Sequence, residues 1–543
     1  MSQAMQPQYT LYGAGRRRDR RLQTALGVLA RLRVLALPAA MAVLAALVLT
    51  AGCRDKKGEA PPAATAGHGA DAVGSAPDAV GQPIGDEGRK AHLPHVRQEM
   101  LSADFWIGRM AGAEPTLPSP DEVRLTPEEV AAYSRRILES SHGALQDLAS
   151  FPEALSRAEL AERALSWSPG DRPLFRDGIE VPREELDAVA LNRNEAGMLD
   201  SNPVRLGTTW QRADLRMWPT AVPVFEEADD DRFDVFQATA LDPAEPLVVL
   251  HESLDGRWTF VRAYNCDGWL PKAQVALVPN RADWLSLVTP ERFLVVTGAQ
   301  LVLGPDSGSA HLEGVRFLMG ARLPLWPEPA PAALAGRSTA GSHVVSLPEP
   351  GPDGNARLAA IQVPASGDVH VGYLPYTRGN VVSQAFRMLG LPYGWGGSNG
   401  GVDCSAFIAG VYRTMGLRLP RNSGRQELTP GRSFLLHAAS ASNGPSSPTM
   451  ESPLNAVPPG ASLFLKGHTL IYLGNVEGRD YAIHAMSAYQ SDGRKIPVFG
   501  VVVSDLSLVR TSGVSLADSL TSAVDLVVRT EAAPAAWEGE GQP

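Results

Sequence analysis

A stripe of hydrophobic residues at helical spacing follows a glycine-rich stretch in the last third of the chain. The stripe consists of Phe407, Ile408, Val411 and Met415. This spacing predicts a helix with one buried face, with Asp403 at its N-cap and Cys404 in its first turn. Because a helix N-terminus favours the thiolate, we expect the pKa of Cys404 to fall below the usual value of about 8.5. The Asp403 carboxylate opposes that change, which suggests a second role, such as binding a cationic part of a substrate.

Short apolar runs typical of strands follow this helix. They cover residues 461–465, 468–473, 481–485 and 501–503. Before the helix, Asn380 is in a position to cap another helix, which would end at Gly390. Helices followed by strands indicate an α+β domain, which we place at residues 377–543. Residues 430–459 are rich in Ser, Asn and Pro and predict a long loop.

The middle of the chain shows a period of two. In residues 258–264, larger side chains alternate with smaller ones, and an Asp-Gly turn flanks this segment on each side. This pattern predicts a small β-barrel over residues 203–280. Two short matches then recur in the same order at nearly the same offset, which predicts a second copy of the module over residues 281–376. The matching segments are Trp218-Pro219 with Trp326-Pro327, and Gly268-Trp-Leu-Pro271 with Gly372-Tyr-Leu-Pro375.

Residues 91–202 show helical spacing without obvious chemistry, and we predict a helical N-terminal domain there. Thr126 and Glu129 have the spacing of a capping box before an apolar stripe. Ahead of this domain, residues 54–90 are rich in Ala, Gly, Pro and Asp and contain almost no large apolar residue. Such a segment cannot bury enough surface to order its backbone, so we expect a flexible linker.

Residues 1–53 have the pattern of an export signal. A basic segment precedes an apolar run over residues 34–49, and small residues lead to Cys53. The run is shorter than the ~20 residues that a membrane span usually needs. Small residues before a cysteine resemble the lipobox of bacterial lipoproteins, which implies lipidation of Cys53 and a membrane-anchored protein on the periplasmic side of the cell envelope. An ordinary signal peptide or an uncleaved anchor is the alternative.

Composition limits the possible classes of function. The net charge is −10, but residues 1–53 hold seven arginines and one aspartate, so the rest of the chain carries −16. This acidic balance argues against nucleic-acid binding, which requires a basic face. The three cysteines, Cys53, Cys266 and Cys404, are widely spaced, which argues against a disulfide framework or a structural zinc site. A chain of 543 residues is also too long for one core, so we expect several domains.

Two histidines in adjacent predicted strands complete a set of candidate catalytic residues. His468 begins one strand and His484 lies in the next, so a hairpin can bring both imidazoles to one face. If the Cys404 helix packs against that face, His468 would take the thiol proton, and His484 would orient its ring. Backbone N–H groups at the helix start would hold the oxyanion. The same three side chains could instead bind zinc, although no fourth ligand is evident.

Five ordered motifs in this region resemble those of NlpC-type papain-like cell-wall cysteine peptidases. They are Tyr393-Gly-Trp-Gly-Gly397, Asp403-Cys-Ser-Ala-Phe407, Leu419-Pro-Arg-Asn-Ser423, Gly467-His-Thr-Leu-Ile-Tyr-Leu-Gly474 and Ile483-His-Ala485. The resemblance implies an α+β papain-like catalytic domain, preceded by two small bacterial SH3-like β-barrels and a helical N-terminal region. It implies Cys404 as nucleophile, His468 as base and His484 as third member, with no cofactor and no metal.

The whole layout resembles the branch of this family that cleaves γ-D-glutamyl bonds to meso-diaminopimelate or lysine in murein stem peptides. By this resemblance, the side chains that line the substrate cleft are Tyr393, Asp403, Ser405 and Ser423. Asp403 would pair with a free L-Ala amine, and Tyr264 of the first SH3-like module, or less favourably Glu252, would close that subsite. Two alternatives stay open: general cleavage of the intact wall, and a non-catalytic lipoprotein that binds peptidoglycan through its SH3-like modules.

Overall fold

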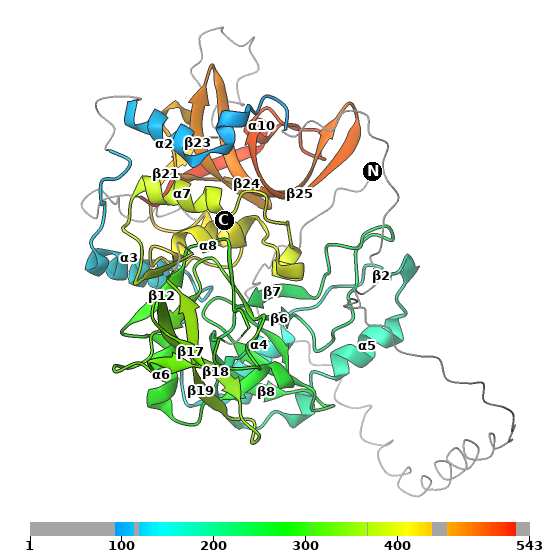
Figure 1. The fold of residues 1–543 in the computed structure, drawn as a ribbon. Helices are drawn as coiled ribbons and strands as arrows, with labels where there is room; N and C mark the ends of the chain where they lie inside the picture. Colours follow the sequence, from blue (N-terminus) through cyan, green and yellow to red (C-terminus); the bar gives the residue numbers. More distant parts are fainter. Residues whose placement is uncertain (1–92, 113–118, 306, 366–367, 437–452, 528–543) are drawn as a thin grey trace, which may run out of the picture. The chain divides into compact units, whose positions relative to one another are not determined.

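The computed structural model describes residues 93–112, 119–305, 307–365, 368–436 and 453–527, and Figure 1 shows their fold. The predicted signal segment, its Cys53 and the predicted linker over residues 54–90 lie outside the described residues. Among the helices within the described ranges, none is long and apolar enough to cross a membrane.

The helices between residues 93 and 202 pack into several cores instead of forming one of their own. They are α2 (Ala103–Gly112), α3 (Pro127–Ser140), α4 (Arg157–Leu165) and α5 (Arg183–Leu191). α2 and α3 bury Trp106 and Tyr133 in the core of the C-terminal domain, whereas α4 and α5 bury Leu160 and Leu186 with residues of the first β-module. The prediction of a separate helical domain is therefore wrong, because each helix has a narrow apolar face that needs a partner.

The capping box predicted before α3 is present. The N–H of Thr126 donates to Glu129 Oε2 at 2.8 Å, and the N–H of Glu129 donates to Thr126 Oγ1 at 3.3 Å. This pair satisfies N–H groups that a helix start leaves without intrahelical acceptors. Short elements complete this part of the chain: η1 (Gln98–Leu101), β1 (Ala154–Ser156), β2 (Phe175–Arg176), β3 (Ile179–Glu180), η2 (Glu195–Gly197) and β4 (Ser201–Pro203).

Residues 205–277 form a seven-stranded antiparallel sheet with the order β11-β5-β8-β9-β10-β6-β7. Its elements are β5 (Arg205–Thr209), β6 (Ala213–Arg216), β7 (Gln237–Leu241), β8 (Pro246–Glu252), β9 (Trp258–Arg262), β10 (Asp267–Pro271), η3 (Lys272–Gln274) and β11 (Val275–Leu277). Every residue of β9 is buried. Trp258 and Phe260 pack in the core that includes α4, and Val261 packs in a second small core. The alternation along this strand therefore separates two cores and does not separate core from solvent.

A second β-module follows and has its own core, which includes Leu294, Phe317 and Leu347. Within the described ranges, its strands are divided among several small antiparallel sheets. Its elements are α6 (Arg281–Val288), β12 (Phe293–Val296), β13 (Gln300–Val302), β14 (Arg316–Leu318), β15 (Arg322–Pro324), β16 (Ala333–Leu334), β17 (Arg337–Ser338), β18 (Ser342–Pro350), β19 (Ala356–Pro364) and β20 (Val369–Val371).

The C-terminal domain is built on a six-stranded sheet with the order β21-β26-β22-β23-β24-β25. The strands are β21 (Arg432–Leu435), β22 (Ser462–Leu465), β23 (His468–Val476), β24 (Arg479–Ser491), β25 (Arg494–Asp505) and β26 (Leu520–Asp525). The helical elements are α7 (Arg378–Arg387), η4 (Trp395–Gly400), α8 (Cys404–Arg413), α9 (Ser423–Gln426), η5 (Pro453–Ala456) and α10 (Leu516–Ser519). Figure 1 shows α7 and α8 beside the strands β23 and β24, with which α8 is in contact.

Two local predictions in this domain are wrong. α7 begins after Thr377 and not after Asn380, because Thr377 Oγ1 accepts the N–H of Asn380 at 3.0 Å. β21 lies inside the predicted loop over residues 430–459 and pairs with β26. This pairing joins segments about 90 residues apart in sequence, so a local pattern does not reveal it. Residues 437–452 of the same loop lie outside the described residues.

α8 is enclosed on nearly all sides. Eight of its ten residues are buried, although the sequence pattern predicts only one buried face. Phe407 and Ile408 lie in the core shared with β23 and β24. On another side, a Cβ atom at Gly410 would lie 3.5 Å from the carbonyl oxygen of Met319 in the second module. The β-modules therefore cover a second face of α8, which the hydrophobic stripe alone does not predict to be buried.

Candidate active site

Cys404 is the first residue of α8 and is 7% exposed. Asp403 caps the helix, and its Oδ1 accepts the N–H of Ala406 at 2.9 Å. The backbone N–H groups of Thr469 and Ser405 are directed at the Cys404 sulfur. Since Thr469 directly follows His468, this contact places the thiol beside the start of β23.

The two imidazoles form a hydrogen-bonded pair. His468 Nε2 lies 2.7 Å from His484 Nδ1, and the ring centroids are 5.0 Å apart. On its other side, His484 Nε2 lies 2.9 Å from Ser504 Oγ. His484 and Ser504 are fully buried, whereas His468 is half-buried. Of the four ring nitrogens of the two imidazoles, His468 Nδ1 is therefore the one that takes no part in the hydrogen bonds between His468, His484 and Ser504.

Ser504 is a site residue that the sequence did not indicate. β24 pairs with β25 so that His484 lies opposite Val502. Ser504 therefore stands diagonal to His484 on the same face, within reach of its ring. Nothing in the local sequence marks this serine, because its role depends on the register between two strands.

The residues that pack beneath α8 and the two histidines occupy alternate positions along β23 and β24, so their side chains point to opposite faces of the sheet. Ile471, Ile483 and Ala485 lie in the core beneath α8, and His484 stands between the last two in sequence. α8 thus reaches the imidazole pair through its first turn only. The condition that the helix packs against the imidazole face is therefore met by its first turn alone, which brings Cys404 to the start of β23.

Burial sets the charge state of the site. Burial, with the Asp403 carboxylate adding to it, raises the pKa of the Cys404 thiol to about 12. Burial, together with Arg510, lowers the pKa of His468 to about 3, while Asp403 opposes the shift. The pKa of His484 is lowered well below its usual value by burial and by His468. The resting site is therefore a neutral thiol beside two neutral imidazoles, and the predicted lowering of the thiol pKa is wrong because burial outweighs the helix terminus.

Asp403 belongs to a buried network with Arg421. The guanidinium donates from Nη2 to Asp403 Oδ2 at 2.5 Å and from Nη1 to Oδ1 at 3.2 Å. Ser405 Oγ donates to Asp403 Oδ1 at 3.0 Å and accepts from Arg421 Nη1 at 2.8 Å. Burial raises the pKa of the Asp403 carboxyl, but Arg421 and these hydrogen bonds outweigh burial, so the net pKa is lowered. The expected substrate contacts of Asp403 and Ser405 therefore compete with contacts already made inside the protein.

The site lies in a part of the chain that matches a known family. Residues 390–492 match the NlpC/P60 family. These residues form an NlpC/P60 domain. The match includes Cys404, His468 and His484, and the family is one of peptidoglycan hydrolases, generally cysteine peptidases. Residues 223–271 match an SH3 domain of the SH3b1 type. The predicted combination of SH3-like and papain-like NlpC/P60 domains is confirmed.

Known proteins resemble this chain over different lengths. It is 29% identical over 168 residues to the gamma-D-glutamyl-L-lysine dipeptidyl-peptidase of Bacillus cereus (strain ATCC 10987 / NRS 248), and the similarity covers 29% of this chain and 42% of that protein. The chain thus spans less than half the length of this curated relative. The solved structure of an NlpC/P60 endopeptidase from Photobacterium damselae subsp. piscicida shares the fold, with a TM-score of 0.57 and 15% identity, over 75% of this chain and 95% of that one.

The SH3b domain contacts the glycine-rich loop of the NlpC/P60 domain. Gln237 Nε2 donates to the carbonyl of Gly396 at 3.0 Å, and Trp395 Nε1 donates to the carbonyl of Asp234 at 3.1 Å. Gly396 has φ of 58°, and a Cβ atom there would lie 2.5 Å from Gln237 Cγ. Glycine is therefore required both for the backbone conformation and for the close approach of the SH3b domain.

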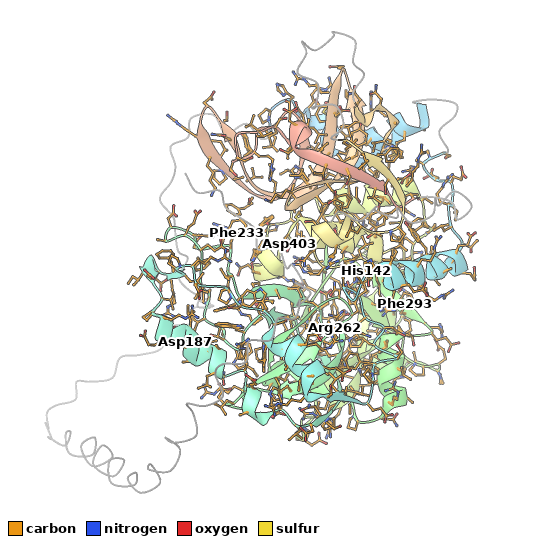
Figure 2. The ribbon with its side chains drawn as sticks, turned by 180° about the vertical axis from the view of Figure 1, so that it is seen from behind. His142, Asp187, Phe233, Arg262, Phe293 and Asp403 are labelled. Carbon is orange, nitrogen blue, oxygen red and sulfur yellow. The ribbon has the colours of Figure 1, made fainter. Side chains whose placement is uncertain are left out.

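An aromatic contact extends this interface toward the thiol. The ring of Phe233, from the SH3b domain, lies 6.1 Å from the ring of Tyr393 and 5.6 Å from that of Trp395. Figure 2 labels Phe233 and Asp403, near where the cyan-to-green part of the ribbon meets the yellow part. Burial raises the pKa of Tyr393 well above its usual value, and Cys404 and Asp403 add to the rise. The backbone of Tyr393 forms a bridge with Val402, two residues before Cys404. The half-buried Tyr393 thus lies between the SH3b domain and the thiol, where it was predicted to line a cleft.

Other predicted substrate contacts lie in different positions. Ser423 begins α9 and is half-buried. Tyr264 is buried, and its ring is covered by the guanidinium groups of Arg413 and Arg418 at 5.6 and 5.4 Å. Arg413 is the last residue of α8, so Tyr264 lies at the end of the helix opposite to Cys404. The prediction that Tyr264 closes the substrate subsite is therefore wrong, because the SH3b domain docks this tyrosine against the far end of α8.

The geometry also bears on the zinc alternative. Within the part of the chain that the structure describes, no group of three or more His, Cys, Asp or Glu residues is arranged to hold a metal ion. A shared ion would need one nitrogen from each imidazole. Both nitrogens of His484 instead face His468 and Ser504. The arrangement suits an acid–base relay beside a thiol.

Proposed function

We propose that this protein is a cysteine endopeptidase that hydrolyses the γ-D-glutamyl bond to the diamino acid, meso-diaminopimelate or lysine, of murein stem peptides. The observation that carries the proposal is the 2.7 Å pair of His468 and His484 beside a cysteine at a helix start. The Bacillus cereus relative, named for a γ-D-glutamyl-L-lysine bond, supports this choice of bond.

The hydrogen-bond order of the site determines how His468 acts. For His468 Nδ1 to accept the thiol proton, the neutral ring must carry its hydrogen on Nε2 and donate it to His484 Nδ1. His484 then carries its hydrogen on Nε2 and donates it to Ser504 Oγ. Ser504 Oγ can accept this hydrogen, so the hydrogen-bond order is compatible with the tautomer of His468 whose Nδ1 lone pair is free to take a proton.

The reaction then proceeds through an acyl-enzyme. Cys404 transfers its proton to His468 Nδ1 as the sulfur attacks the γ-carbonyl carbon of D-Glu. The tetrahedral intermediate expels the amine of the diamino acid, which takes the proton from His468. A water molecule then attacks the thioester, with His468 again taking and returning a proton. The products are the γ-carboxylate of L-Ala-D-Glu and the free diamino acid, or a peptide that begins with it.

Backbone N–H groups at the start of α8 stabilise the oxyanion. The first N–H groups of a helix have no intrahelical acceptor. Asp403 already accepts the N–H groups of Ala406 and Phe407, through its side chain and its carbonyl. The N–H group of Cys404, and that of Ser405 once it turns away from the sulfur, are the ones that can bind the oxyanion. In a water-poor site, such donors are worth several kcal/mol in the transition state, on the order of 3 per donor.

The SH3b domain closes the side of the site that receives the N-terminal end of the substrate. Phe233 contacts Tyr393 and Trp395, and the acidic residues 229–231 precede it in the same loop. These carboxylates supply the negative potential that a free L-Ala amine needs, since Asp403 is already paired with Arg421. A closed, acidic subsite favours stem peptides with a free N-terminus over intact wall.

A direct test uses the full chain with L-Ala-γ-D-Glu-meso-diaminopimelate and with its N-acetylated form. The expected result is cleavage of the γ-D-glutamyl bond, with a kcat/KM for the free amine roughly 100-fold higher, about the contribution of one charge-assisted contact. Equal cleavage of both peptides would remove the amine subsite and favour general wall cleavage. Absence of cleavage would overturn the proposed function.

We also propose that the protein acts as a lipoprotein of the cell envelope, anchored through lipid on Cys53. The support is the basic segment, the apolar run and the small residues before this cysteine. Incorporation of labelled palmitate into the native chain, and its loss in Cys53→Ala, is the expected result. Unchanged labelling of the variant would contradict the anchor without affecting the proposed chemistry.

A further inference from the structure

Arg510 is a half-buried arginine near the imidazole pair. It begins a tight turn in which its N–H donates to the carbonyl of Val514 and its carbonyl accepts the N–H of Gly513, both at 2.8 Å. Its guanidinium donates from Nη2 to the carbonyl of Lys466 at 3.3 Å. Burial lowers the pKa of the Arg510 guanidinium. The charge is therefore partly removed from water and compensated by one neutral acceptor.

Other partly buried arginines of this domain have carboxylate partners. Arg378 pairs with Asp525 at 2.6 Å, and Arg421 pairs with Asp403 at 2.5 Å. Among the described residues, no carboxylate lies within ion-pair distance of Arg510. A partly desolvated guanidinium keeps four N–H donors that the Lys466 carbonyl does not use. A carboxylate is the group that matches this fork.

The position of Arg510 indicates which part of a substrate would meet it. Lys466 lies in the turn between β22 and β23, two residues before His468. The positive charge of Arg510 also acts on the His468 ring. The SH3b domain instead contacts the site through Tyr393 and Trp395 on the glycine-rich loop. Arg510 therefore belongs to the histidine side of the scissile bond.

The leaving group lies on that same side. In the proposed reaction, His468 gives its proton to the amine of the diamino acid, so this amine must lie at the His468 ring. Lysine carries a carboxylate on the carbon next to this amine, and meso-diaminopimelate carries a second carboxylate at the other end of its side chain. Each diamino acid can thus bring a carboxylate into the region of Arg510.

We propose that Arg510 is a specificity residue that binds a free carboxylate of the leaving diamino acid. This inference rests on the proposed function. It predicts that the protein prefers stem peptides whose diamino acid bears such a carboxylate, either at the α-position or on the side chain. It also predicts a lower rate where every carboxylate on this residue is amidated or extended by further residues.

Three substrates with a free L-Ala amine separate the two sources of the carboxylate. L-Ala-γ-D-Glu-L-Lys has the α-carboxylate alone, its C-terminal amide has neither, and the meso-diaminopimelate peptide with an α-amide has the side-chain carboxylate alone. For the full chain, we expect kcat/KM to be roughly 10- to 100-fold higher for at least one of the two acids than for the lysine amide. Arg510→Gln should lower kcat/KM for that acid toward the amide value, and the loss should be much smaller for the amide, which has no carboxylate for Arg510 to bind.

Two further variants distinguish binding from structure. Arg510→Lys keeps the charge but loses the planar fork, and it should recover only part of the preference. Arg494→Gln removes an exposed positive charge in the neighbouring hairpin and should leave all three values unchanged. An equal loss for all substrates in Arg510→Gln, or no preference in the unaltered protein, would overturn the inference alone. Absence of cleavage of all three by the unaltered protein would overturn the proposed function, and this inference with it.

Discussion

At each end of α8 lies a partly buried arginine that pairs with carboxylates. At the start of the helix, Arg421 donates to both oxygens of Asp403. At its end, Arg413 lies 3.4 Å from Glu245 and 3.7 Å from Asp242 of the SH3b domain. The first pair adjoins a thiol and the two N–H groups of a helix start. The second pair adjoins the ring of Tyr264. A cavity of about 70 Å³ lies between the β-modules and α8, and Arg413 and Arg421 both line it.

The difference shows how one helix serves two purposes. At the Arg413 end, charges from two domains neutralise one another, so this end holds the SH3b domain against the NlpC/P60 domain. At the Cys404 end, Asp403 is held by Arg421 and by backbone N–H groups from its own domain, including that of Gly396 at 3.1 Å. Changes at the two ends should therefore separate chemistry from domain packing.

The largest expected effect is at the reactive end. Cys404→Ala removes the nucleophile and should lower kcat by at least about 10⁴-fold. The free energy of unfolding should change by no more than about 1–2 kcal/mol, since only the sulfur atom is lost. Peptide hydrolysis followed by chromatography, together with urea denaturation, measures both. Retained hydrolysis would show that the reactive group lies elsewhere.

Arg413→Met tests the opposite end. It leaves the carboxylates of Asp242 and Glu245 with fewer buried partners, and it should lower the free energy of unfolding by about 3 kcal/mol. Arg212 lies 3.2 Å from Asp242 and continues to pair with it. The loss of unfolding free energy should therefore lie at the lower end of the ~3–5 kcal/mol that breaking a buried ion pair usually costs. We expect kcat of the folded variant to stay within about threefold of the original.

Arg135→Met, at an exposed position of α3, is the matched control and should change neither quantity. If Arg413→Met lowered kcat as strongly as a change at Asp403 while the fold stayed stable, the separation between the two ends of α8 would not hold.

A smaller effect is expected from Ser504→Ala. His484 would lose its partner for Nε2 and could adopt the other tautomer, which would turn a hydrogen toward His468 Nε2 and disturb the relay. We expect kcat to fall roughly tenfold, KM to stay similar, and stability to fall by about 1–2 kcal/mol. Ser433→Ala in the exposed part of β21 serves as control. A loss of stability without a change in kcat would give Ser504 a structural role only.

The pH profile is the most subtle test of the reactive end. His468 acts as a base when it is neutral, and burial together with Arg510 lowers its pKa to about 3, while Asp403 opposes the shift. The acidic limb of kcat/KM should therefore lie well below pH 6.5, the usual pKa of histidine. Asp403→Asn should move this limb to still lower pH. An acidic limb at or above pH 6.5 in the unaltered protein would indicate that a charged imidazole forms in the resting site.

Local patterns predicted the parts of the site that depend on local structure. Hydrophobic spacing and a capping residue located α8 with Cys404 at its start, and alternation located the strands of His468 and His484. The direction of the thiol pKa could not be predicted, because it depends on burial. Burial outweighs the helix terminus once the SH3b domain and the sheet surround α8.

Features that depend on distant segments also escaped the sequence. Arg421 appeared within a recognised motif, but only the fold brings its guanidinium to Asp403. Ser504 and β21 depend on strand register, and the helices of residues 93–202 depend on which core each one joins. Alternation along β9 predicted a strand, but not that both of its faces are buried in separate cores.

The most direct test of the central claim is detection of the acyl-enzyme. The full chain is mixed with L-Ala-γ-D-Glu-L-Lys, quenched within milliseconds and digested, and the peptide that contains Cys404 is weighed by mass spectrometry. We expect an L-Ala-γ-D-Glu acyl group on Cys404, which accumulates before lysine release becomes steady and is absent in His468→Ala. Steady release of lysine with no adduct on Cys404, at a rate that Cys404→Ala does not change, would contradict it.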